Sequence, residues 1–261
     1  MIKIEHLTKK YGERYAINDV SFEVADGEIV GFLGPNGAGK TTTMNILTGY
    51  LSSTSGRAMI DGMDILEHPM EVKKKIGFLP EQPPLYMEMT PYEYLGFIYD
   101  LKKCTLNKKE HLDEICEVVK ISDVKNRMIK NLSKGYKQRV GIAEAIIGDP
   151  KVIILDEPTA GLDPVGCRQI LSNILSYREK TGATVIVISH NMDDVARLAE
   201  RILVFNHGRI VMDGAPDEVF ADPARLIDIG LSVPHATEIA MELRARGVAL
   251  PDAIYTHSQL K

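Results

Sequence analysis

The sequence predicts an α/β fold with a mixed sheet core, an N-terminal antiparallel β subdomain, an inserted α-helical subdomain and a short helical C-terminal tail. Two observations carry this prediction. Short runs rich in β-branched residues each lead into a polar residue, which is typical of buried parallel strands. Between these runs lies a long stretch in which apolar residues recur at helical spacing. The chain of 261 residues is long enough to bury a substantial core.

Four apolar runs predict the core strands: IVGFLG (29–34), VIILDE (152–157), VIVISH (185–190) and ILVF (202–205). In open α/β sheets, ligands bind at the carboxyl ends of the strands. The polar residues that follow these runs are therefore candidate site residues. The segment 2–24 alternates with turn signals instead, and it predicts a small antiparallel sheet.

The helical stretch runs from Thr90 to about residue 130. Thr90 is a predicted N-cap, Pro91 suits the first helical position, and Glu93 completes a capping box. The apolar residues that follow keep helical spacing: Tyr94, Leu95, Ile98 and Leu101. We therefore predict a helical subdomain at about 84–140, inserted into a domain of residues 1–216, with a helical tail at 217–261.

The composition narrows the functional class. A formal net charge of −5 argues against a nucleic-acid binder that uses a broad basic surface. Three cysteines without metal-ligand spacing favour reduced thiols and a cytoplasmic location. The N-terminus does not resemble a signal peptide, and no apolar run approaches the roughly 20 residues of a membrane span. Any membrane role is expected to come through a partner.

The segment GPNGAGKTT matches the phosphate-binding pattern G-x-x-x-x-G-K-[ST] between a predicted strand and a predicted helix. Its glycines allow successive backbone amides to face phosphate oxygens, and the helix dipole adds positive charge. Lys40 would hold the β- and γ-phosphates of ATP, and Thr41 would bind Mg²⁺. A glycine-rich turn without a ligand is the alternative, which this context disfavours. The predicted ATP-binding residues are Gly34, Pro35, Asn36, Gly37, Ala38, Gly39, Lys40, Thr41 and Thr42.

Two other strand ends supply candidate catalytic residues. Asp156 would bind Mg²⁺ directly or through water, and Glu157 would polarise the attacking water. His190, at the end of VIVISH, would contact the γ-phosphate and keep the water in register with Glu157. A single histidine at a strand end is more often structural, so the assignment of His190 depends on the whole set.

Residues 1–215 resemble the nucleotide-binding domains of ABC transporters. The resemblance implies that Tyr11 stacks on the adenine and that Gln82 contacts both Mg²⁺ and the membrane subunit. The segment AGLDP would place Asp163 at a dimer seam, and LSKGYKQR is a variant of the family signature. Each match is weak alone, but together and in this order they are specific.

The resemblance also implies a head-to-tail pair of nucleotide-binding subunits with two ATP molecules between them. Ser133 and Gly135 of one subunit would then close over the γ-phosphate held by the other. Lys134 stands where the commoner signature has glycine, and this departure leaves the rate of hydrolysis open. The pair of subunits would transmit its movement to a transmembrane permease. This implies that the chain is peripheral on the inner face of the cell membrane.

Different parts of the chain resemble different transporters. Residues 1–164 look like ATPases of export-type ABC systems, and the rest looks like ATPases of energy-coupling-factor importers. One hypothesis is a chain with two parentages that join near Asp163, engineered or natural, which binds nucleotide without a working transport partner. The other two hypotheses are a transporter motor ATPase and a soluble ABC-type ATPase of translation or repair. Copurification with a membrane subunit would distinguish them.

The tail predicts one amphipathic helix that begins at Pro234 and ends before a left-handed Gly247. Its apolar stripe consists of Ala236, Ile239, Ala240 and Leu243. Such a short helix needs a surface to pack against. That surface is either its own domain or the equivalent tail of a second subunit. In the second case, a chain truncated after Ala221 is expected to be a folded monomer that dimerises only with ATP.

Overall fold

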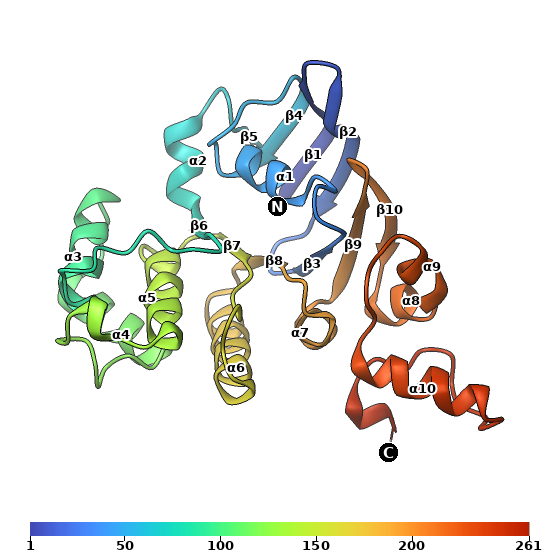
Figure 1. Cartoon of the computed structure of the whole chain (residues 1–261). Coiled ribbons are helices and arrows are strands. Elements are labelled where there is room, and N and C mark those ends of the chain that lie inside the picture. The colour runs from blue at the N-terminus through green and yellow to red at the C-terminus, as the bar shows by residue number, and fades with distance from the viewer. Residues whose placement is uncertain (261) are drawn as a thin grey trace. The chain divides into compact units, whose positions relative to one another are not determined.

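The computed structural model describes residues 1–260 and divides into two compact units (Figure 1). Unit 1 contains residues 1–66 and the chain from residue 187 on, and unit 2 contains residues 67–186. Strand β8 (Thr184–Ile188) begins in unit 2 and ends in unit 1. None of the helices among the described residues combines the length and the hydrophobicity of a membrane span.

Unit 1 opens with a four-stranded antiparallel sheet in the order β2-β1-β4-β5. Its strands are β1 (Ile2–Tyr11), β2 (Arg14–Val24), β4 (Ser55–Ile60) and β5 (Met63–Asp64). β1 and β2 form a tight hairpin in which Tyr11 pairs with Arg14. Alternate side chains of β1 are buried, as expected for a sheet with one face against a core. The predicted N-terminal antiparallel sheet is confirmed.

A second group of strands in unit 1 positions the phosphate-binding loop. β3 (Ile29–Leu33) is buried at every residue and runs parallel to β9 (Arg201–Asn206), which pairs antiparallel with β10 (Arg209–Gly214). The chain leaves β3 at Leu33 and enters helix α1 (Lys40–Leu47) after six residues. The loop therefore lies at the carboxyl end of a buried parallel strand, where ligands bind in this class of sheet.

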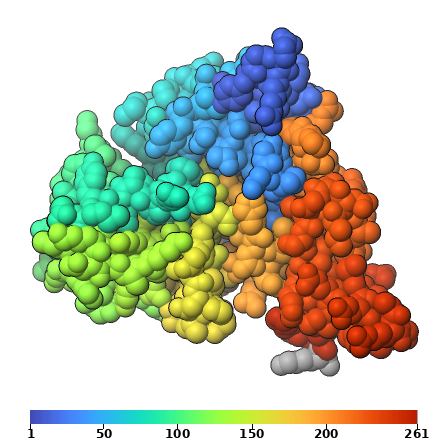
Figure 2. Space-filling model, in the orientation of Figure 1, coloured from blue at the N-terminus to red at the C-terminus, as the bar shows by residue number. Residues whose placement is uncertain are grey.

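Helix α7 (Met192–Leu198) lies between β8 and β9, and three helices follow β10: α8 (Pro216–Phe220), α9 (Pro223–Asp228) and α10 (His235–Ala245). A short 3-10 helix, η2 (His257–Leu260), ends the described chain. Leu226, Leu231 and Val233 belong to the same buried cluster as Leu33 of β3 and Phe220 of α8. The segment up to Val233 is thus part of the core of unit 1. The C-terminal part of the chain is drawn in orange and red in Figure 2.

Helix α10 corrects one boundary of the sequence analysis. Pro234 is the N-cap residue, so the helix begins at His235, and Gly247 has the expected left-handed backbone (φ 87°) just after the C-cap Arg246. Ala236 and Ala240 are fully buried against Ile254, with Leu250 and Leu260 beside them. This half of the apolar stripe packs within the chain.

Besides the start of β8, unit 2 contains the strands β6 (Ile76–Leu79) and β7 (Val152–Asp156) and several helices. β6 and β7 are parallel. The helices are α2 (Pro69–Lys75), α3 (Pro91–Leu101), α4 (Lys108–Val118), η1 (Ile129–Asn131), α5 (Lys134–Ile146) and α6 (Pro164–Thr181). The capping box predicted for Thr90 and Glu93 is present, and α3 begins at Pro91 as predicted. α3, α4 and α5 form the helical part, and α5 extends it to Ile146.

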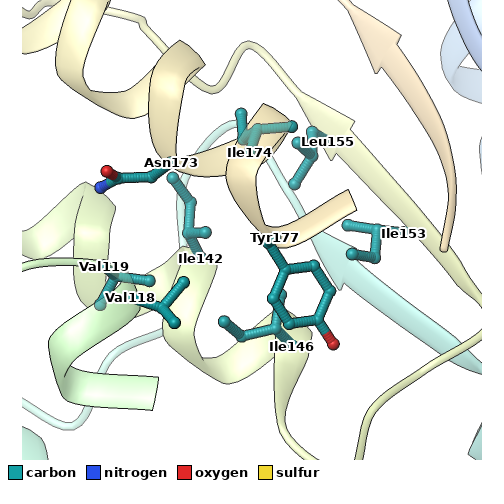
Figure 3. A pocket seen from close by; sticks show the side chains of 9 residues that line it. All are labelled: Val118, Val119, Ile142, Ile146, Ile153, Leu155, Asn173, Ile174 and Tyr177. Atoms are coloured by element: carbon teal, nitrogen blue, oxygen red, sulfur yellow. The ribbon is translucent and has the colours of Figure 1, made fainter. Parts of the chain in front are cut away.

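A small apolar cavity lies where α4, α5, α6 and β7 meet (Figure 3). Its volume is about 10 Å³, room for a single water molecule, and the aliphatic side chains of Ile142, Ile146 and Ile153 line it beside the ring of Tyr177. None of the predicted site residues lines this cavity. It is a small cavity in the apolar interior of unit 2, apart from the predicted site residues.

Candidate functional site

The loop 34–39 has a backbone that only glycine can adopt at two positions. Gly34 has φ 147°, and a Cβ atom there would lie 2.3 Å from the carbonyl oxygen of Phe205. Gly39 has φ 110°, and a Cβ atom there would lie 2.7 Å from the carbonyl oxygen of Ala16. Both distances exclude any side chain, so the loop can take this curled form only with these glycines.

Lys40 is the first residue of α1, and its side chain is only 5% exposed. Its ammonium group folds back over the loop, where Nζ donates to the carbonyl oxygens of Gly34 and Pro35, the second at 3.1 Å. The N-terminus of α1 faces the same loop and adds the positive end of its dipole. A buried ammonium, a helix N-terminus and a glycine-built curve together fit a polyphosphate. Thr41 is exposed at the start of α1.

Asp156 and Glu157 lie at the end of β7 in unit 2, and both are partly buried. Glu157 has a left-handed backbone (φ 49°), which is uncommon for a residue with a side chain. Its carbonyl oxygen accepts from the backbone N–H of Ala160 at 3.0 Å and from Nε2 of Gln138 at 3.4 Å. These contacts hold an unfavourable conformation at the residue that we predict to be the general base.

The signature segment begins α5. Ser133 is the N-cap, and its Oγ accepts from the backbone N–H of Tyr136 at 3.4 Å. The side chain of Lys134 lies over Gly161 so closely that a Cβ atom at Gly161 would be 2.0 Å from Nζ. The predicted departure at Lys134 therefore has a local role, since its stem packs on the loop that leads to Asp163.

Asp163 is the N-cap of α6. Its Oδ1 accepts from the backbone N–H groups of Val165 at 2.9 Å and of Gly166 at 2.8 Å. The carboxylate thus has a structural role in its own chain, whereas its predicted place at a dimer seam stays a prediction.

Three further predicted residues are exposed. Tyr11 ends β1 with 54% of its surface exposed, and Nζ of Lys9 lies 5.2 Å from its ring centre. Gln82 is exposed between β6 and α3. His190 is exposed immediately before Asn191, the N-cap of α7.

The predicted site residues are divided between the two units. Unit 1 holds Tyr11, the loop 34–42 and His190. Unit 2 holds Gln82, Ser133, Gly135, Asp156, Glu157 and Asp163. Within unit 2 the start of α5 and the segment 157–163 are in contact, through Gln138 with Glu157 and through Lys134 with Gly161.

Sequence reasoning missed Gln138. It is 4% exposed and shares the buried face of α5 with Ile142 and Ala145. A polar side chain at a helical position otherwise filled by apolar residues was the available signal, because a buried amide requires a partner.

Known proteins resemble this chain in sequence and in structure. The family model described as "ABC transporter" matches residues 17–160. The chain is 38% identical to the energy-coupling factor transporter ATP-binding protein EcfA2 of Caldanaerobacter subterraneus subsp. tengcongensis, over 100% of this chain and 95% of that protein. It is also 37% identical to the rat ATP-binding cassette sub-family A member 2, over 83% of this chain but 9% of that protein.

Solved structures agree with these sequence matches. The structure of cbiO1 from Clostridium perfringens, part of the ABC transporter complex cbiONQ, has a TM-score of 0.78 and 29% identity, over 92% of this chain and 98% of that one. The dimeric post-hydrolysis state of the ATP-binding cassette MJ0796 with ADP and phosphate has a TM-score of 0.75 and 28% identity, over 82% of this chain and 98% of that one.

These matches test the hypothesis that the two parts of the chain come from different types of transporter. A relative of one type aligns with the whole chain, across the proposed junction near Asp163 and through the tail. A chimera is therefore not supported, and the export-like appearance of residues 1–164 needs no second origin.

Proposed function

Since the chain belongs to the ABC transporter family and is an ATPase, we propose that it is the motor subunit of an energy-coupling-factor-type transporter. The observation that carries this proposal is the 38% identity to an ATP-binding protein of that type over 100% of the chain. The tail at 217–261 is included in that match. The alternative, a hybrid ATPase without a transport partner, is not favoured.

In this proposal the loop 34–42 binds the phosphates of ATP. Lys40 exchanges its hydrogen bonds with the loop carbonyls for the β- and γ-phosphate oxygens, at little cost because the ammonium is already buried there. Tyr11 has the exposed ring face that adenine stacking requires. The nucleotide is thereby held at both ends.

The residues around Glu157 supply the hydrolytic chemistry. Glu157 accepts a hydrogen bond from the attacking water, and His190 keeps that water in register. Thr41, Gln82 and Asp156 offer the oxygen ligands that Mg²⁺ prefers, and the bound ion would neutralise charge on the phosphates. The chain's own contribution is to orient the water and to hold the carboxylate of Glu157 in place.

A second copy or a related subunit completes each site. Ser133 and Gly135 lie at the N-terminus of α5, where backbone amides and the helix dipole favour an anion. We assign that anion as the γ-phosphate held by the other subunit, with Asp163 at the seam. Each subunit then contributes half of two sites.

The membrane subunit binds at the helical part of unit 2, near Gln82 and α3. Tyr86, Met87, Phe97 and Leu101 expose apolar surface there, between 38% and 66% of each side chain. The chain would thus lie on the cytoplasmic face of the membrane through this contact. No nucleic acid is involved.

Copurification tests this function. A tagged chain is expressed in its native host, membranes are extracted with mild detergent, and bound proteins are identified by mass spectrometry. We expect a polytopic membrane protein in stoichiometric amount together with ATPase activity. Recovery of an active ATPase that carries no membrane protein would contradict the transport role.

A further inference from the structure

A cluster of polar side chains joins α3 to α5 inside unit 2. The hydroxyl of Tyr94 in α3 donates to Oε2 of Glu144 in α5 at 2.6 Å. Nζ of Lys102, the C-cap residue of α3, donates to the carbonyl oxygens of Glu144 at 3.2 Å and Ile147 at 3.0 Å. Tyr94 and Lys102, both on the α3 side, thus hydrogen-bond to Glu144 and to the C-terminal end of α5.

These groups are withdrawn from water. Tyr94 is only 2% exposed, and Lys102 and Glu144 are partly buried. Burial raises the pKa of the Glu144 carboxyl and lowers the pKa of the Lys102 ammonium. Polar groups in such a place are costly unless they are paired, so removal of one partner is expected to disturb the other two. The cluster therefore fixes α3 and α5 to each other specifically.

Lys102 also secures the end of α5. The last carbonyl groups of a helix lack partners within it, and a cation there is favourable to the helix dipole. α5 has 13 residues and so is about 20 Å long. Ser133 caps its other end. One rigid element therefore runs from the cluster to the signature segment.

The ring of Tyr94 also contacts aromatic side chains at the surface. Its ring contacts the ring of Tyr86 at a centroid distance of 5.8 Å, and Tyr86 contacts Phe97 at 5.6 Å. Tyr86 is 52% exposed and Phe97 38% exposed. Figure 2 shows this part of the chain, in blue-green, at the surface of unit 2. Tyr94 thus touches surface aromatic residues with its ring and α5 with its hydroxyl.

We propose that Tyr94, Glu144 and Lys102 form a buried polar link that couples the exposed surface around Tyr86 and Phe97 to the helix that carries Ser133. They are positioning residues, since none of them belongs to the proposed nucleotide-binding set. The identity of the membrane subunit as the occupant of that surface depends on the proposed function, whereas the link itself is a property of unit 2. Nucleotide binding at Ser133 would change the surroundings of Phe97. Contact at Phe97 would in turn change the affinity for nucleotide at Ser133.

The chain contains no tryptophan, so Phe97→Trp creates a single fluorescent reporter on this surface. The full-length variant is titrated with AMP-PNP and Mg²⁺, and nucleotide binding is measured separately by displacement of a fluorescent ATP analogue. We expect the tryptophan emission to change with nucleotide. When Tyr94→Phe or Lys102→Met is added to Phe97→Trp, the change in emission on nucleotide binding should fall by about fivefold or more, while nucleotide still binds.

Tyr99→Phe is the matched control. Tyr99 is also a buried tyrosine of α3, but its hydroxyl donates to the carbonyl oxygen of Leu106 and not to α5. It should lower stability comparably, as thermal unfolding would report, and leave the emission change intact. The link is refuted if nucleotide binds without an emission change, or if Tyr94→Phe and Tyr99→Phe behave alike. Loss of nucleotide binding in the Phe97→Trp parent would instead count against the proposed function.

Discussion

At the scale of a single residue, Glu157 is the proposed general base, and its backbone conformation is unusual. A carboxylate at a strand end is ordinary, but this one has a left-handed backbone whose carbonyl oxygen is held by Gln138 and Ala160. Strain of this kind persists only where the surroundings impose it. The backbone at Glu157 is thus held by contacts within unit 2, and it sets the direction in which the side chain leaves the strand.

Glu157→Gln is expected to keep ATP binding and to lower kcat by roughly 10²- to 10⁴-fold, the usual contribution of a general base. The amide has nearly the shape of the carboxylate but cannot take the proton. ATP affinity and turnover are measured side by side, with Lys40→Ala as the comparison that should lose nucleotide affinity. Turnover near the wild-type rate in Glu157→Gln would rule out Glu157 as the base.

At the scale of elements, the polar cluster of Tyr94, Lys102 and Glu144 joins α3 to α5. This cluster should make the stability of the folded chain depend on pH. The pKa of Glu144 is raised in the folded chain by burial, above its ordinary value of 4.5. The folded state therefore binds this proton more tightly than the unfolded state does. Its contribution to stability is fully present below pH 4.5 and is lost as the pH rises through the folded-state pKa.

Glu144→Gln removes this titration but keeps an acceptor for the hydroxyl of Tyr94. The free energy of unfolding of the variant, relative to wild type, should consequently increase from pH 4.5 to pH 8. Denaturant unfolding at several pH values measures this difference. Parallel stability profiles would show that Glu144 does not titrate as its burial requires.

Elements with local determinants were predictable from sequence. The start of α3 depends on Thr90, Pro91 and Glu93, which are adjacent in the chain. The start of α1 at Lys40 depends on the glycines just before it. The links from Tyr94 to Glu144 and from Gln138 to Glu157 span 50 and 19 residues, and no local pattern encodes such pairings. Tertiary contacts were therefore the part that sequence could not supply.

Helix α10 also changes the design of its own test. A cut after Ala221 would remove Leu226, Leu231 and Val233 from the core of unit 1, so the chain would be expected to unfold whether or not the tail dimerises. A cut after Pro234 removes the helix but keeps every buried member of that core, and it removes only Met241 and Tyr255 from the partly buried residues packed against it. Ile239 and Leu243 remain only half-buried on the stripe, and they are the candidates for contact with a second tail.

Ile239→Asp should accordingly weaken association without nucleotide and leave ATP binding unchanged, because a charge would be placed on the proposed tail-to-tail contact. Sedimentation velocity measures the association state, and Glu242→Ala, on an exposed position of α10, serves as the control. An association state equal to that of the wild type in Ile239→Asp would exclude the tail as a dimer contact.

At the scale of the whole molecule, one chain carries half of each of two proposed ATP sites. The loop with Lys40 lies in unit 1, whereas Ser133 caps α5 in unit 2. The family resemblance predicts a role for both motifs in ATP binding. The pairing of one chain's Lys40 with another chain's Ser133 is a property of an assembly, which a single chain does not specify.

A mixture of Lys40→Ala and Ser133→Ala chains tests this central claim most directly. Each variant alone carries a defect in both sites of its homodimer. A mixed dimer has one site in which an intact Lys40 faces an intact Ser133. We expect equal amounts of the two chains to hydrolyse ATP at a rate well above the mean of the separate proteins. Activity equal to that mean, in a mixture shown to exchange subunits, would contradict it.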